Sequence, residues 1–151
     1  MKVEIKQMPK LRAATLRYIG PYNRISEAFN RLGEIAGPAG LLAAKPTMLA
    51  IYHDDPDTTP ERELRSDAAV VIPEDATVPS GLVEQRLPAG RYACAIHVGP
   101  YEELGDAWAR FKGQTSSDQR VGDGASYEIY RNDPTEVPKQ ELRTEMYVPL
   151  A

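Results

Sequence analysis

Runs of strand-favouring residues, several of them alternating apolar and polar positions, recur along the chain and are bounded by proline, glycine and aspartate. They predict strands over residues 2–8, 11–20, 48–54, 65–73, 82–87, 91–99, 126–132 and 142–149. The joins Pro9-Lys10 and Pro88-Ala89-Gly90 contain turn-favouring residues. We therefore expect each join to close a hairpin between the strands that flank it.

Two other segments carry apolar residues at the spacing i, i+3, i+4 and i+7, which is typical of an amphipathic helix. The first has its apolar side chains at positions 25, 28, 29, 32, 35 and 36, and we expect it to end before Gly37-Pro38. The second repeats the spacing at positions 104, 107, 108 and 111. One helix therefore follows each predicted hairpin.

The sequence contains an internal repeat. Gly20-Pro21-Tyr22 reappears 79 residues later as Gly99-Pro100-Tyr101, and the apolar positions of the two helices match at the same offset. Further along, the motif I-Y-x-x-D-P-x-x-x-P-x-x-E-L-R begins at Ile51 and again at Ile129, an offset of 78. A deletion of one residue explains the change of offset.

The repeat predicts an α+β fold with the order β-β-α-β-β twice, in largely antiparallel sheets. A length of 151 residues is the usual size of one domain, so we expect a single domain over residues 1–151, with repeats at about 1–78 and 79–151. One helix on a four-stranded sheet leaves surface uncovered, which favours packing of the two copies about a pseudo-twofold axis. The central cleft at that axis is the expected ligand pocket.

The charge and hydropathy of the chain narrow the function classes. The formal net charge is -4, and the 18 Lys and Arg residues are scattered, so direct nucleic-acid binding is disfavoured. The first residues do not have the pattern of a signal peptide, and no apolar run approaches the length that spans a bilayer. We expect a cytoplasmic protein without membrane contact.

Cysteine and histidine are rare. Cys94 lies in an alternating run and is expected to be a buried core residue. With one cysteine and only His53 and His97, the chain assembles neither an intrachain disulfide nor a zinc site of several Cys and His ligands. We expect no metal and no cofactor.

At the repeated motifs the chain resembles the GyrI-like family, which comprises DNA gyrase inhibitory proteins and the effector-binding domains of certain AraC- and MerR-type regulators. The most telling stretches are Ile51–Pro73, Gly99-Pro100-Tyr101 followed by Trp108, and the closing Glu145–Pro149. The resemblance covers essentially the whole chain and has no added DNA-reading segment, so it implies the stand-alone form. It also implies that a drug-like, aromatic or cationic compound binds between the repeats.

By this resemblance a glutamate on the last strand, here Glu145, meets the positive charge of the ligand. Glu145 and Tyr147 alternate along the strand and share a face. Their counterparts in the first repeat are Asp67 and Ala69, so the second repeat has the larger polar and aromatic pair. The alternative is that Glu145 pairs with an arginine such as Arg143 or Arg65.

Aromatic residues are the other ligand candidates, because their rings can form the walls of a cation site. Trp108 replaces Phe29 on the apolar face of the second helix and is either a core or a pocket residue. Tyr52 and Tyr130 are related by the repeat, as are Tyr22 and Tyr101, and duplicated residues are more often scaffold. We retain Trp108, Tyr52, Tyr101 and Tyr130 as ligand-binding candidates.

Three functions are consistent with the sequence. The leading one is a small-molecule-binding protein that also modulates DNA gyrase. The resemblance also implies a hydrolase of cyclopropane-containing DNA-alkylating compounds, with Glu145 as the catalytic general base. The third is a gyrase inhibitor that acts by protein contact alone and needs no pocket.

Overall fold

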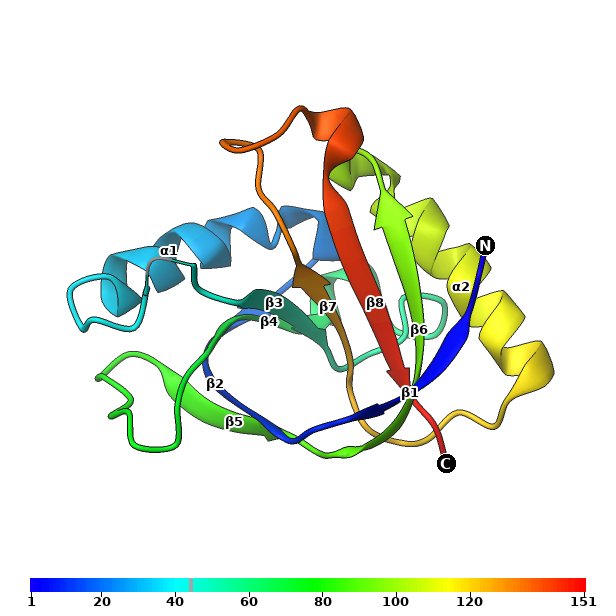
Figure 1. Ribbon diagram of the computed structural model, residues 1–151, viewed down its shortest axis with the longest axis horizontal. Helices are drawn as coiled ribbons and strands as arrows, with labels where there is room; N and C mark the ends of the chain where they lie inside the picture. The colour runs from blue at the N-terminus through cyan, green and yellow to red at the C-terminus, as the bar shows by residue number, and fades with distance from the viewer. Residues whose placement is uncertain (44) are drawn as a thin grey trace. The chain divides into compact units, whose positions relative to one another are not determined.

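The computed structural model describes residues 1–43 and 45–151, and they form two compact units. The first unit consists of Met1–Pro9 with Ala89–Ala151, and the second of Lys10–Pro88. Each unit contains four antiparallel strands and one helix, so the predicted α+β class and the duplication are both confirmed. The strands and helices of both units are labelled in Figure 1.

The first unit has the strand order β1-β6-β8-β7. Its elements are β1 (Glu4–Met8), β6 (Gly90–Val98), α2 (Leu104–Asp118), β7 (Ser126–Tyr130) and β8 (Arg143–Pro149). Short 3-10 turns at Tyr101–Glu103 and Lys139–Glu141 precede α2 and β8. Both chain ends belong to this unit, where β1 and β8 flank β6 (Figure 1).

The second unit has the strand order β3-β4-β2-β5. Its elements are β2 (Leu11–Ile19), α1 (Ser26–Ala36), β3 (Met48–Tyr52), β4 (Arg65–Val71) and β5 (Val83–Leu87). The 3-10 turns at Tyr22–Arg24 and Glu61–Glu63 take the same places as in the first unit. The internal repeat of the sequence is therefore a repeat of structure, element by element.

The predicted hairpins are wrong, although all four of their strands exist. β1 pairs with β6 instead of β2, with Met8 opposite Gly90, and β2 pairs with β5, with Leu11 opposite Leu87. Pro9 explains part of the difference, because proline holds the preceding residue in an extended conformation and so favours continuation of the chain over a tight turn. Each compact unit consequently takes its outermost strand from the other repeat.

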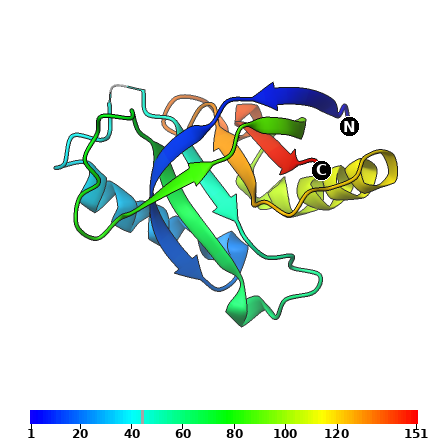
Figure 2. The ribbon, with the colours of Figure 1, turned by 90° about the horizontal axis from the view of Figure 1, so that it is seen from below.

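Each helix covers one face of its own sheet, as the two ribbon views show (Figures 1 and 2). The buried residues recur every fourth position, namely Ala28, Leu32 and Ala36 in α1 and Ala107, Phe111 and Thr115 in α2. This spacing places them on one side of a helix. The first helix ends at Ala36, as predicted, while the second runs beyond Phe111 to Asp118.

Small residues on the sheet let α2 approach closely. Ala93 and Ala95 on β6 pack with Met146 and Val148 on β8 against Ala107 and Phe111, and all six are almost completely buried. Glu145 and Tyr147 alternate with this pair on β8 and so lie on the opposite face of the sheet. Within the described residues, no helix is long and apolar enough to cross a membrane.

Candidate functional site

A buried carboxylate lies among aromatic side chains on the α2 face of the first unit. Glu128, on β7, is 2% exposed and sits opposite Met146 of the apolar cluster. Its carboxylate accepts a hydrogen bond from Trp108 Nε1 at 3.1 Å and another from Tyr130 Oη at 3.1 Å. Both of these donors are aromatic side chains.

Local structure brings these side chains together. Glu128 and Tyr130 are two residues apart on β7, so they project from the same face of the strand. Trp108 follows the buried Ala107 on α2, and its ring centre is 5.6 Å from that of Phe111. The ring of Tyr101, at the start of the 3-10 turn, is 5.6 Å from the ring of Tyr130 in an edge-on arrangement.

The sequence candidates therefore separate into groups. Trp108, Tyr130 and Tyr101 gather around Glu128, whereas Glu145 and Tyr147 lie on the other face of the same sheet. Tyr52 belongs to the second unit, where its ring is 4.6 Å from that of Tyr22.

Glu128 itself was missed by sequence reasoning. The signal was present, because a glutamate occupies a strand position that is Ala50 in the first repeat, between two tyrosines in Tyr127-Glu128-Ile129-Tyr130.

Glu145 is already paired. Arg131 Nη2 is 2.9 Å from Glu145 Oε1, and Tyr147 Oη donates to the same oxygen at 2.6 Å. Burial alone would raise the pKa of Glu145, but the hydrogen bonds from Arg131 and Tyr147 lower the pKa below its ordinary value. The sequence left open that Glu145 pairs with an arginine such as Arg143 or Arg65. The structure shows such a pair, and the arginine is Arg131. A carboxylate held ionised in this way is a weak general base.

Tyr147 is part of an aromatic cluster. It is 2% exposed, and its ring stacks on Tyr127 with 5.0 Å between centres and meets Tyr92 edge-on at 6.4 Å. Burial and the bond to Glu145 raise the pKa of the Tyr147 hydroxyl. Cys94 lies opposite Tyr147 on β6 and is buried, as predicted from its alternating run.

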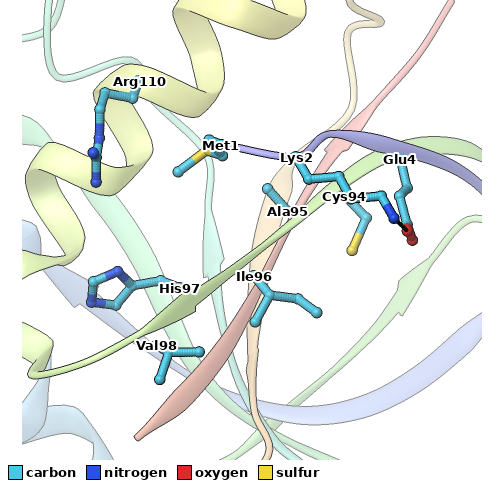
Figure 3. Close-up of a pocket in the computed structure, with 9 residues that line it drawn as sticks. All are labelled: Met1, Lys2, Glu4, Cys94, Ala95, Ile96, His97, Val98 and Arg110. Carbon is cyan, nitrogen blue, oxygen red and sulfur yellow. Dashed lines mark ion pairs between the residues drawn. The ribbon is translucent and has the colours of Figure 1, made fainter. Parts of the chain in front are cut away.

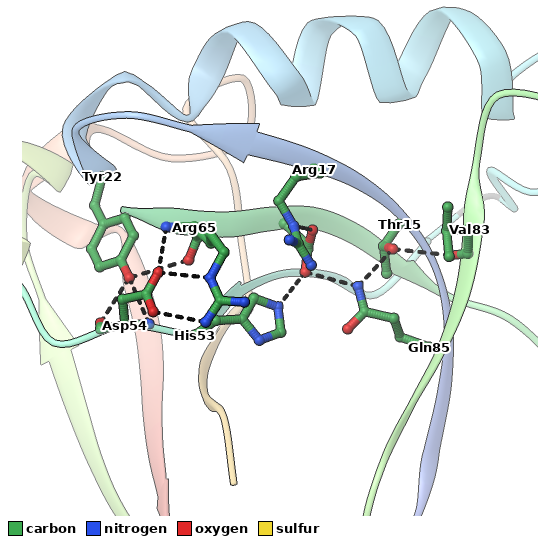
Figure 4. Close-up of polar contacts among 9 residues, drawn as sticks. Thr15, Arg17, Tyr22, His53, Asp54, Arg65, Val83 and Gln85 are labelled. Atoms are coloured by element: carbon green, nitrogen blue, oxygen red, sulfur yellow. Dashed lines mark hydrogen bonds and ion pairs between the residues drawn. The ribbon is translucent and has the colours of Figure 1, made fainter. Parts of the chain in front are cut away.

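The second unit has its own carboxylate at the position equivalent to Glu145. Asp67 is 1% exposed, and its carboxylate accepts hydrogen bonds from Arg17 Nε at 2.7 Å and from Gln85 Nε2 at 2.8 Å. His53 Nε2 is 2.5 Å from the same carboxylate. Figure 4 shows Arg17, His53 and Gln85 converging from β2, the end of β3 and β5.

The surroundings of Asp67 keep it ionised. Burial raises its pKa, and the three donors outweigh burial, so the pKa of Asp67 is lowered to about 2. Gln85 also donates to Thr15 Oγ1 at 2.9 Å, and that hydroxyl donates to the carbonyl of Val83. Figure 4 shows this chain of bonds, which fastens β5 to β2 and β4. This arrangement has the features of a structural network.

Among residues 1–43 and 45–151, no three His, Cys, Asp or Glu side chains gather closely enough to hold a metal ion. The carboxylates of Glu145 and Asp67 are both occupied by protein donors. What the arrangement around Glu128 offers is a buried carboxyl group with aromatic neighbours.

The structure is thus an antiparallel α+β protein that is built from a repeat and has a buried carboxyl group among aromatic side chains. The match to known proteins is more specific: the GyrI-like small molecule binding domain matches residues 1–151. The chain belongs to this family. It is a GyrI-like small-molecule-binding domain, so the resemblance seen in the sequence and the binding function are confirmed.

Individual relatives agree. A DNA gyrase inhibitor of Citrobacter koseri is 28% identical, over 99% of this chain and 98% of that protein. The C-terminal domain of EcmrR has a TM-score of 0.84 at 19% identity, with coverage of 99% and 97%. SAV2435, solved with bound tetraphenylphosphonium, has a TM-score of 0.72 at 14% identity, with coverage of 100% and 94%. The two solved structures support the fold of this chain.

Proposed function

We propose that this protein binds an aromatic cation, with Glu128 as the opposing charge and Trp108, Tyr130 and Tyr101 as aromatic walls. The observation that carries the proposal is the pair of hydrogen bonds from Trp108 and Tyr130 to the buried Glu128 carboxylate. These two aromatic donors orient the carboxylate.

Two physical effects favour such a ligand. A carboxylate in a mostly buried position is costly to ionise, so a cation placed beside it is held more strongly than at an exposed site. The faces of tryptophan and tyrosine attract cations, by about 0.5–2 kcal/mol for each contact. Tyr101, which is 37% exposed, brings one of these rings to the surface.

Glu145 remains a predicted ligand residue, and an arginine lies beside it. Its charge is opposed by Arg131 at 2.9 Å, which reduces its attraction for a second cation. The two glutamates lie on opposite faces of one sheet, so substitution of each one tests a different face. Tyr147 and Tyr52 likewise remain predicted ligand residues.

Isothermal titration with tetraphenylphosphonium, the cation bound by the structural relative SAV2435, tests the proposal. We expect Glu128→Gln to weaken binding about tenfold or more, since it removes the charge and keeps the shape. Glu145→Gln is the matched control and should leave the affinity within about twofold. Equal weakening by both substitutions, or by Glu145→Gln alone, would place the cation elsewhere.

A contact with DNA gyrase is a separate proposal, supported by the name of the 28% identical relative from Citrobacter koseri. A supercoiling assay with purified gyrase measures it directly. Inhibition at a stoichiometric excess of this protein supports the contact, and unchanged supercoiling rejects it. If Glu128→Gln inhibits gyrase as well as the wild type, ligand binding and gyrase inhibition use different surfaces.

A further inference from the structure

One edge of β6 is only partly paired. β1 pairs with β6 from Met8 opposite Gly90 to Glu4 opposite Cys94, and β6 continues to Val98. The four residues Ala95–Val98 therefore extend beyond the last pair with β1. Their other edge is occupied, because β8 pairs with β6 as far as Val98 opposite Arg143.

The chain before β1 turns away from this edge. The Met1 carbonyl accepts a hydrogen bond from Gln114 Nε2 on α2 at 3.0 Å, and Val3 packs on the apolar cluster beneath α2. A pocket of about 300 Å³ opens between this segment, β6 and α2. Figure 3 shows it, with Met1 and Lys2 on one side, β6 on another and Arg110 reaching in from α2.

Backbone N–H and C=O groups point outward along the open edge of β6. The N–H of Gly99 donates to Leu142, and the carbonyl of Arg91 accepts from Leu150, so the odd-numbered residues of β6 point toward β8. Backbone groups alternate along an antiparallel strand. Ile96 and Val98 consequently direct their N–H and C=O groups toward the open side.

The side chains of this edge have different chemistry on the two faces of the sheet. Ile96 and Val98 point away from α2 and are 38% and 57% exposed. His97 and Ala95 lie on the α2 face, toward Arg110 (Figure 3). Arg110 forms no ion pair with another residue in the described ranges, whereas its repeat counterpart Arg31 is bonded to Glu34 at 3.0 Å.

We propose that the Ala95–Val98 edge binds an extended acidic segment of a partner protein, which adds to the sheet as a strand in line with β1. Side chains of such a strand alternate between the faces. One set would be acidic and meet Arg110, and the other would be apolar and cover Ile96 and Val98. The charge of Arg110 selects an acidic segment over a basic one.

Fluorescence anisotropy with a labelled octapeptide of alternating valine and glutamate tests this proposal, with alternating valine and lysine as the comparison peptide. We expect the glutamate peptide to bind more tightly. Val98→Pro should weaken it about tenfold, because proline removes the N–H directed at the incoming strand and keeps the β8 side intact. Ile19→Pro, at the equivalent position of β2, should leave binding unchanged.

Charge reversal at Arg110 provides a second test that does not alter the backbone. Arg110→Glu should weaken the glutamate peptide about tenfold and strengthen the lysine peptide, while Arg31→Glu should change neither. Equal affinity for both peptides, or binding that survives Val98→Pro, would overturn the proposal. So would dimerisation in sedimentation velocity without peptide that Val98→Pro abolishes, since a second copy would then occupy the edge.

Discussion

The two units have the same strands and helix, yet equivalent carboxylates have different surroundings. Asp67 in the second unit is held by Arg17, His53 and Gln85, while Glu145 in the first is held by Arg131 and Tyr147. His53 and Arg131 are themselves repeat counterparts. In both units a residue at the end of one strand, His53 or Arg131, contacts an acid on the next strand, so this pair is part of the duplicated scaffold.

The positions around Glu128 differ more deeply. Its counterpart Ala50 is completely buried, and the counterpart of Trp108 is Phe29, which has no N–H to donate. Of the two repeats, the second is therefore the one in which a carboxylate at this position accepts hydrogen bonds from two aromatic side chains. Retained pairs therefore belong to the scaffold, and the departures from symmetry on the α2 face are where we propose the ligand site.

The largest expected effect is a loss of stability on substitution of Asp67. Asp67→Asn removes a buried charge and leaves Arg17 and His53 facing an amide, so we expect the free energy of unfolding to fall by about 3 kcal/mol. Glu145→Gln should cost about 1 kcal/mol, because Glu145 has fewer partners and Arg131 is 42% exposed. Urea unfolding of the wild type and both variants measures the difference. Equal losses would show that the two acids contribute alike.

The second prediction concerns acid unfolding. The pKa of Asp67 is about 2 in the folded protein and about 3.9 in an unfolded chain, so its contribution is complete above pH 4. That contribution, about 3 kcal/mol, is lost as the pH falls from about 4 to about 2. The stability gap between wild type and Asp67→Asn should shrink over this window. If the stability difference between wild type and Asp67→Asn stays constant from about pH 6 to about pH 2, the difference comes from packing and not from the charge of Asp67.

Sequence reasoning predicted the elements better than their partners. Local patterns are enough to predict a strand such as 2–8. Pro9, however, is compatible with either a turn or an extended link. The pairing of β1 with β6, and of β5 with β2, depends on long-range contacts that local patterns do not reveal. Trp108, Tyr130 and Tyr101 could be chosen as ligand candidates because aromatic residues stand out in the sequence, and they stay predictions. Glu128 was not chosen, since a glutamate in a strand is usually solvent-facing, and only the packing of α2 buries it.

The smallest expected effect distinguishes the duplicated tyrosines. Tyr22 Oη donates to the Asp54 carbonyl at 2.7 Å and accepts from the Asp54 N–H at 3.0 Å, and burial raises its pKa to about 12. Tyr22→Phe should therefore lower the free energy of unfolding by about 1 kcal/mol.

Tyr101 is the matched control, because its hydroxyl makes no hydrogen bond with another residue of the described ranges. Tyr101→Phe should change stability by less than about 0.5 kcal/mol. Tyr101→Ala, which removes the ring, should weaken binding of tetraphenylphosphonium, since the Tyr101 ring borders Tyr130 at the proposed Glu128 site. A stability loss for Tyr101→Phe as large as that for Tyr22→Phe would make both tyrosines scaffold and remove Tyr101 from the ligand site.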